Sequence, residues 1–206
     1  MPSQALQNLN QRMQDIEQLL QAHTALTQFQ LARRAAQRAG GELNRIAEII
    51  GNLVNRPGRG RRTEVGALNR AAMVLLSAHL QGFVEDLHSE AANIILAGKV
   101  ANIERVIENA KPRNFNPHAD IIEKIFDGIG LYEIIDGIRW QKTSNSTVKR
   151  RLTAYIQIRN KIAHGAQESI TKGKVNGFKD FVEHFAQNLD EAVTIKIQEY
   201  TNARPW

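Results

Sequence analysis

The sequence contains no cysteine among its 206 residues, which excludes disulfide bonds and thiolate metal ligands. This absence fits a reducing compartment, so we expect a cytoplasmic protein. Aromatic residues make up only 6% of the chain, and the core must therefore be mainly aliphatic. The longest apolar-rich run, residues 71–80, is too short to cross a bilayer, and the polar start of the chain does not resemble a signal peptide. We therefore expect a soluble protein with no membrane partner.

Positive charge is concentrated in the first third of the chain. The net charge is +6, and residues 1–62 contain nine Lys and Arg against four Asp and Glu, whereas residues 63–206 contain eighteen against seventeen. Such an excess favours an anionic partner, with nucleic acid first, although a solvated arginine-rich surface is the alternative. Residues 56–62 concentrate this charge in a loop with two glycines and a proline. The loop contains four arginines: Arg56, Arg59, Arg61 and Arg62. They are candidate contacts to RNA phosphates, and the alternative is that the loop is a solvated connector.

Nearly every apolar pattern has helical spacing, and no segment alternates as a strand does. The sequence therefore predicts an all-α fold. The expected helices are a long one between the Ser3 cap and Gly40-Gly41, then 42–55, 63–97, 99–110, 117–127, 130–138, 146–164 and 176–201. The narrow apolar seam of the first helix indicates a helical packing partner. We expect two parts: residues 1–62, an N-terminal helical extension ending in the basic loop, and residues 63–206, a helical domain.

The motif Arg-Asn-Lys-Ile-Ala-His-Gly, residues 159–165, lies at the end of a predicted helix. Asn160 and His164 share a helix face, with Arg159 to one side. A histidine can act as a general acid or base on a ribose 2′-hydroxyl, and an arginine can bind phosphate oxygens through hydrogen bonds. Gly165 fits the left-handed position that ends a helix. The alternative is that His164 caps its helix and Arg159 is a surface cation.

A metal site or a cofactor is not expected. None of the six histidines has another histidine three or four residues further along the chain, and there is no cysteine to assist them. The sequence also contains no phosphate-binding loop, dinucleotide fingerprint or nucleophile elbow.

Three segments resemble the HEPN superfamily of helical RNases and RNA-binding domains. RNKIAHG at 159–165 looks like its R-N-x-x-x-H motif. STVKRRLTAYIQIRNKIAHG at 146–165 and AAMVLLSAHLQGFVEDL at 71–87 resemble the RiboL-PSP-HEPN branch in particular. The likeness covers roughly residues 64–203 and implies a HEPN-like antiparallel helical bundle, to which the long N-terminal helix would be an extension.

The resemblance implies that Arg159 and His164 are a catalytic pair with Asn160 as their polar companion. It also implies a homodimer whose two motif helices form one composite site, and metal-independent RNA cleavage in toxin, phage-defence or RNA-processing roles. An antitoxin or regulatory protein is then a candidate partner. The alternative is a catalytically inactive HEPN module that binds RNA or dimerises.

Two further features bear on this interpretation. Relatives often carry an acidic residue in the first core helix where this chain has Gln81, which puts acidic assistance at that position in doubt. Lys149 and Arg150 precede the motif by two to three helical turns and are candidate contacts to the RNA backbone, with a solvated helix face as the alternative.

Overall fold

The computed structural model describes residues 1–39, 41, 63–110 and 116–206. Apart from one isolated bridge between Trp140 and Thr143, these residues form helices and connecting loops. The helices are α1 (Gln4–Ala39), α3 (Thr63–Ile95), α4 (Ile103–Ala110), α5 (Ala119–Asp127), α6 (Asn145–Ala163) and α7 (Lys172–Thr201). The expected all-α fold is confirmed. The helix expected at 42–55 and the basic loop at 56–62 lie outside the described residues.

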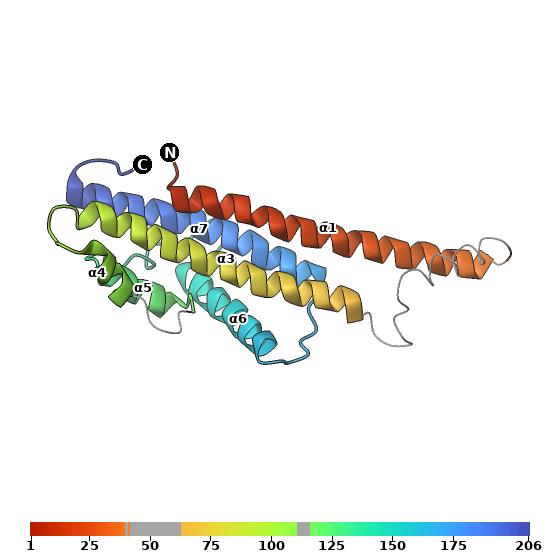
Figure 1. Ribbon diagram of the computed structural model, residues 1–206. Helices are drawn as coiled ribbons and strands as arrows, with labels where there is room; N and C mark the ends of the chain where they lie inside the picture. The colour runs from red at the N-terminus through yellow and green to blue at the C-terminus, as the bar shows by residue number, and fades with distance from the viewer. Residues whose placement is uncertain (40, 42–62, 111–115) are drawn as a thin grey trace.

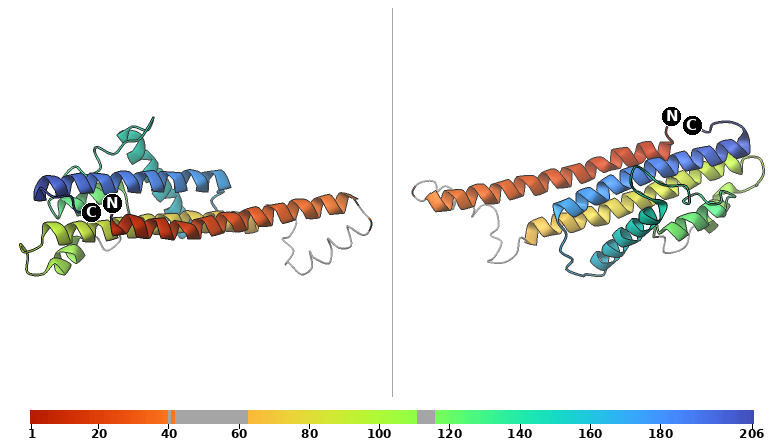
Figure 2. Two further views of the ribbon diagram at one scale, coloured as in Figure 1. Left: turned by 90° about the horizontal axis from the view of Figure 1, so that it is seen from above. Right: turned by 180° about the vertical axis from the view of Figure 1, so that it is seen from behind.

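The three long helices α1, α3 and α7 lie side by side, with α1 antiparallel to the other two (Figure 1). Helix α6 crosses α3 obliquely, and the short helices α4 and α5 pack beside α3, as the further views show (Figure 2). Both ends of the chain lie at the same end of the bundle. The architecture is the helical bundle expected from the sequence.

The core is mainly aliphatic, with phenylalanine confined to a few positions. Helix α7 places Phe178, Phe181 and Phe185 on one buried stripe, and Leu189 and Val193 continue it, as the helical spacing predicts. Phe178 stacks on Tyr155 of α6, and Phe181 contacts both Tyr155 and Trp140, while α7 also packs along α3.

The first half of α1 belongs to the same hydrophobic core. Leu6, Leu9, Met13 and Ile16 are all buried within it, so α3 and α7 supply the helical partner that the apolar seam requires. The last turns of α1 extend past the ends of α3 and α7 (Figures 1 and 2). Leu31, in the second half of α1, is 54% exposed. The division of the chain at residue 62 remains a prediction.

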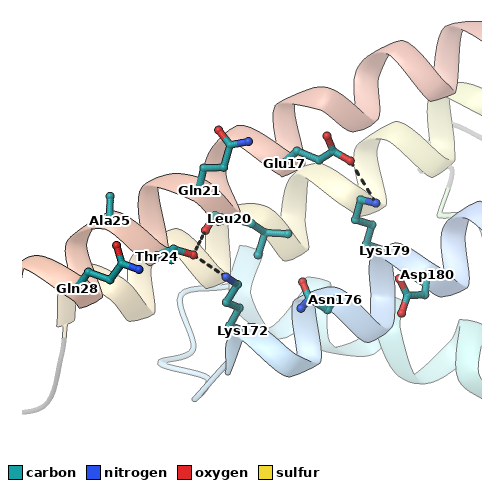
Figure 3. Close-up of a pocket in the computed structure, with 10 residues that line it drawn as sticks. All are labelled: Glu17, Leu20, Gln21, Thr24, Ala25, Gln28, Lys172, Asn176, Lys179 and Asp180. Atoms are coloured by element: carbon teal, nitrogen blue, oxygen red, sulfur yellow. Dashed lines mark hydrogen bonds and ion pairs between the residues drawn. The ribbon is translucent and has the colours of Figure 1, made fainter. Parts of the chain in front are cut away.

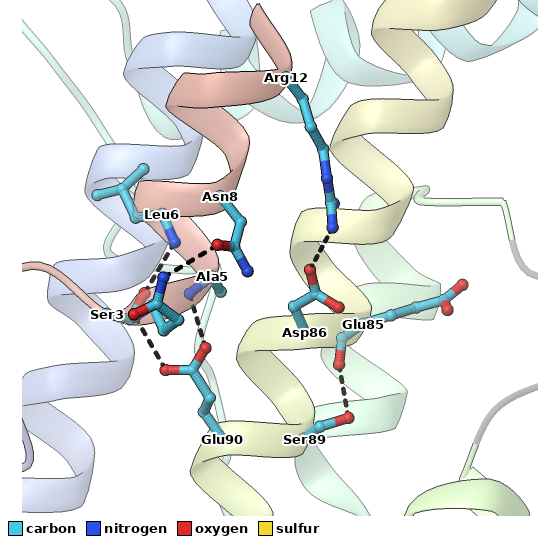
Figure 4. Close-up of polar contacts among 10 residues, drawn as sticks. Ser3, Ala5, Leu6, Asn8, Arg12, Glu85, Asp86, Ser89 and Glu90 are labelled. Carbon is cyan, nitrogen blue, oxygen red and sulfur yellow. Dashed lines mark hydrogen bonds and ion pairs between the residues drawn. The ribbon is translucent and has the colours of Figure 1, made fainter.

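Polar contacts fix the start of α1 against α3 (Figure 4). The buried Ser3 hydroxyl accepts a hydrogen bond from the Leu6 N–H (3.0 Å), which confirms the predicted cap. The Glu90 carboxylate accepts the backbone N–H groups of Gln4 (3.1 Å) and Ala5 (2.6 Å). These contacts satisfy three N–H groups that the first helical turn leaves without intrahelical acceptors.

Arg12 and Asp86 make a second polar connection between the same two helices. The Arg12 Nη2 lies 2.9 Å from the Asp86 Oδ2, and both side chains are partly exposed (Figure 4). The ion pair therefore contributes mainly to the register of α1 on α3, since exposed pairs add little stability.

Glu90 makes the stability of the fold depend on pH. Burial raises the pKa of its carboxyl above the ordinary value of 4.5, against the opposing effect of the hydrogen bonds from Ala5 and Gln4, and the negative charges of Asp190 and Asp86 raise it further. The folded state therefore binds this proton more tightly than the unfolded chain, and the contribution of Glu90 to the free energy of unfolding falls as the pH rises from 4.5 through the raised pKa.

Replacement of Glu90 by glutamine should remove this titration. The free energy of unfolding of the wild type, relative to Glu90→Gln, should therefore decrease as the pH rises through that window. Urea unfolding of both proteins at several pH values on either side of 4.5 measures the difference. A difference that grows in favour of the wild type with rising pH would contradict the assignment.

A groove separates α1 from the beginning of α7 (Figure 3). Two lysines of α7 bridge it: the Lys172 Nζ donates to the Thr24 Oγ1 at 2.6 Å, and the Lys179 Nζ lies 3.5 Å from the Glu17 Oε1. Burial by itself would lower the pKa of Lys179, but hydrogen bonding and charge attraction from Glu183 and Glu17 outweigh it, and the pKa is raised. These bridges tie the middle of α1 to the bundle.

The prediction of a helix at 130–138 is wrong, because this segment forms turns. Its buried apolar residues have helical spacing, but Gly130 and Glu133 both have positive φ angles, of 86° and 57°, which no helix accommodates. The backbone is satisfied from elsewhere, since the Ile135 N–H donates to the Glu123 carboxylate and the Asn145 amide donates to the Ile135 carbonyl. Tertiary hydrogen bonds thus replace the helical ones.

Candidate functional site

Helix α6 carries the motif, and its ends follow from local sequence. Ser144 caps its start by accepting the Thr147 N–H at 3.4 Å. Val148, Leu152 and Ile156 form its buried face and hold it against the core. The motif residues at its other end are consequently presented by a rigid element rather than by a loop.

The C-terminal end of α6 is a Schellman turn. His164 is the C-cap residue of α6, and Gly165 after it has a φ of +84°. The Gly165 N–H donates to the Ile162 carbonyl (3.0 Å), and the Ala166 N–H donates to the Lys161 carbonyl (2.9 Å). The left-handed glycine predicted from the sequence is confirmed. Because these bonds satisfy the last helical carbonyls, the backbone at His164 is well defined.

Arg159 and Asn160 are joined through their side chains. The Arg159 Nη1 donates to the Asn160 Oδ1 at 3.0 Å, and the same Nη1 donates to the Asn116 Oδ1 at 3.1 Å. Arg159 is half-buried, and its Nε is buried with no acceptor among the described residues. The structure thus joins two of the three motif side chains and adds a third residue, Asn116.

Sequence reasoning missed Asn116. It lies 43 residues before Arg159, immediately ahead of Pro117, in a position that looks like an ordinary loop asparagine. No motif or spacing points to it, because its proximity to Arg159 arises from the packing of α5 against α6.

His164 completes the motif on the next turn, and its side chain is exposed. An exposed imidazole at a fixed helix end is accessible to a large substrate such as a polynucleotide. The arrangement therefore offers a titratable group close in sequence to a half-buried guanidinium whose orientation is restrained.

A model of the RiboL-PSP-HEPN family matches residues 42–194, about three quarters of the chain, and this range includes the motif and most of the bundle. The chain belongs to the RiboL-PSP-HEPN family. No curated protein and no solved structure matches it. Family membership supports a HEPN-type, RNA-related function, and α1 lies before the matched range.

The basic residues at the start of α6 lie apart from the HEPN motif. Lys149 is hydrogen-bonded to the Asp136 carboxylate, whereas Arg150 is exposed. At about 1.5 Å per residue, roughly 15 Å of helix separates Arg150 from Asn160. The carboxylate of Asp136 offsets the charge of Lys149, so Arg150 is the more available of the two for phosphate. The arginines of residues 56–62 lie outside the described residues.

In α3, the first core helix of this HEPN chain, polar side chains are bonded to other side chains of the same protein. Gln81, where the family resemblance led us to expect an acid, donates from Nε2 to the Glu85 Oε1 at 3.0 Å. The next acid, Asp86, faces Arg12 of α1. Asp86 therefore does not substitute for the missing acid, because its carboxylate is bound to α1.

Within the described part of the chain, no three His, Asp or Glu side chains are grouped closely enough to hold a metal ion. Over the same residues, no helix combines the length and the hydropathy required to span a bilayer.

Proposed function

We propose that the protein is a metal-independent endoribonuclease of the HEPN type, with the motif end of α6 as its active site. The observation that carries the proposal is that the C-terminal end of α6 presents both a restrained, half-buried Arg159 and an exposed His164. Membership of the RiboL-PSP-HEPN family supports it.

The chemistry requires one proton acceptor, one proton donor and a phosphate-binding cation. His164 removes the proton of a ribose 2′-hydroxyl, and the 2′-oxygen attacks the adjacent phosphorus. The bond from phosphorus to the 5′-oxygen breaks, and that oxygen takes up a proton. Arg159 binds the phosphate oxygens as negative charge develops on them, and Asn160 restrains Arg159. The products are a 2′,3′-cyclic phosphate and a 5′-hydroxyl.

A homodimer would supply both proton-transfer groups. Two motif helices that meet across a cleft bring together two copies of His164, of which one acts as base and the other as acid. The exposure of His164 in the single chain is consistent with this arrangement. Arg150 and the arginines of residues 56–62 would add phosphate contacts that raise affinity without reading sequence.

Incubation of the purified protein with single-stranded RNA in EDTA tests the proposal. We expect cleavage that persists in chelator, fragments that end in a 2′,3′-cyclic phosphate, and no cleavage of the same sequence made with 2′-deoxyribose. Loss of cleavage in EDTA with recovery in Mg²⁺ or Mn²⁺, or cleavage of the deoxy substrate, would overturn the mechanism.

The proposed cellular role is that of a toxin or phage-defence effector held in check by an antitoxin or regulatory protein. The second candidate is an inactive HEPN module that binds RNA or dimerises. Gln81 favours this second candidate, because its amide is hydrogen-bonded to Glu85 and cannot act as an acid. Growth inhibition on expression, compared between wild type and His164→Ala, separates the two.

A further inference from the structure

Asn116 is the one hydrogen-bond partner of Arg159 that comes from outside α6 among the described residues. The Arg159 Nη1 carries two N–H groups and is within hydrogen-bond distance of both the Asn116 Oδ1 (3.1 Å) and the Asn160 Oδ1 (3.0 Å). Two acceptors on one nitrogen, from different elements, fix the plane of the guanidinium and not only its position.

The remaining donors of the guanidinium are the ones that a phosphate can use. With Nη1 occupied, the two N–H groups of Nη2 are left, and Nε is buried. The two amides thus determine which edge of Arg159 faces a ligand. Both acceptors are also neutral, so the guanidinium keeps its full positive charge for phosphate, which a carboxylate in place of either amide would offset.

We propose that Asn116 is a positioning residue that orients Arg159 toward the scissile phosphate, an inference that rests on the proposed ribonuclease function.

The acceptor on Asn116 is held by the core of the bundle. The His118 N–H donates to the Asn116 carbonyl at 2.7 Å, and the intervening Pro117 is buried. Helix α5 follows at once and buries three apolar side chains: Ile122, Ile125 and Phe126. Asn160, in contrast, lies on the same helical turn as Arg159 and moves with it. Asn116 therefore supplies the fixed reference against which the long arginine side chain is oriented.

Two substitutions at residue 116 separate orientation from charge. Asn116→Ala removes the acceptor, and we expect kcat to fall about tenfold or more with a smaller change in KM, because loss of orientation affects the transition state most. Asn116→Asp keeps an oxygen acceptor but adds a negative charge. It should keep Arg159 ordered yet weaken phosphate binding, so KM should rise.

A matched control is available in the same kind of position. Asn102 is an exposed asparagine just before α4, and its Oδ1 accepts the Arg105 N–H at 2.9 Å. Asn102→Ala also removes a loop amide acceptor before a short helix. It should leave kcat and KM unchanged, whereas an equal loss in both variants would show that the effect at residue 116 is only structural.

Two measurements do not depend on cleavage. The guanidinium ¹⁵N signals of Arg159 should show restricted rotation in the wild type and in Asn116→Asp, and faster rotation in Asn116→Ala. Affinity for 2′-O-methyl RNA, which lacks the attacking hydroxyl, should show coupled rather than additive losses for Asn116→Ala and Arg159→Ala.

The outcomes separate the two proposals. A wild-type protein that does not cleave RNA overturns the ribonuclease function, while coupled losses of 2′-O-methyl RNA affinity would still support orientation of Arg159 toward phosphate. Unchanged arginine signals with additive losses overturn the role of Asn116, whether or not the protein cleaves RNA.

Discussion

Replacement of His164 by alanine is expected to slow RNA cleavage about 10²- to 10⁴-fold, the usual loss when a general acid–base group is removed. The side chain is exposed, and the helix end is formed by the backbone of residues 160–166 rather than by the imidazole. The variant should therefore fold, bind RNA and associate as the wild type does. Initial rates on a labelled single-stranded RNA, with circular dichroism and RNA-binding affinity measured beside them, give the comparison.

His184→Ala is the matched control for this substitution. His184 is also an exposed histidine on a helix, but its ring stacks on Trp140, with centroids 5.6 Å apart, and it lies outside the motif. The His184→Ala substitution should leave the cleavage rate unchanged. Equal cleavage by His164→Ala and the wild type would eliminate His164 as the acid–base group, whereas absence of cleavage by both would favour the non-cleaving HEPN module.

Replacement of Leu9 by alanine is expected to reduce the free energy of unfolding by about 2–5 kcal/mol, as for other fully buried leucines. Leu9 is 1% exposed and lies in the hydrophobic cluster that α3 and α7 complete. Loss of its side chain removes buried apolar surface and leaves a cavity at the interface of α1 with the bundle. Urea unfolding followed by circular dichroism measures the change.

Leu31→Ala, on the same helix, provides the control. Leu31 is 54% exposed in the second half of α1, so its truncation should change stability by less than about 0.5 kcal/mol. Equal, small effects of the two substitutions would show that α1 is an independent extension. A large effect of Leu9→Ala alone would show that the cooperative unit includes the start of α1, ahead of the family-matched range.

The sequence determined the secondary structure wherever the signal was local. Helical spacing of apolar residues predicted the long helices, and Ser3 and Gly165 marked one beginning and one end that the structure confirms. The motif at 159–165 and the likeness at 71–87 were likewise sufficient to indicate the HEPN family, because they are contiguous strings that need no tertiary information.

The same local rules failed where distant groups compete for the backbone. Residues 130–138 have apolar spacing typical of a helix, but the Glu123 carboxylate accepts the N–H of Ile135 and the Asn145 amide donates to its carbonyl, and turns form instead. Helix α7 begins at Lys172, before the expected residue 176, because Thr171 accepts the Lys174 N–H as its cap. Only the fold decides which of several available hydrogen-bond partners is close enough to bind.

For the candidate site as well, the sequence determined one part and the tertiary structure determined the other. Its chemistry, an arginine, an amide and a histidine within six residues, is written in the sequence, and so is their placement at a helix end. The orientation of Arg159 is not, because it depends on an amide 43 residues away that α5 brings beside α6. Likewise, the apolar seam of α1 predicted a helical partner, but only the bundle identified it as α3 and α7 of the same chain. Residue types and periodicity are local properties of the chain, whereas the partner of a side chain is fixed by long-range packing.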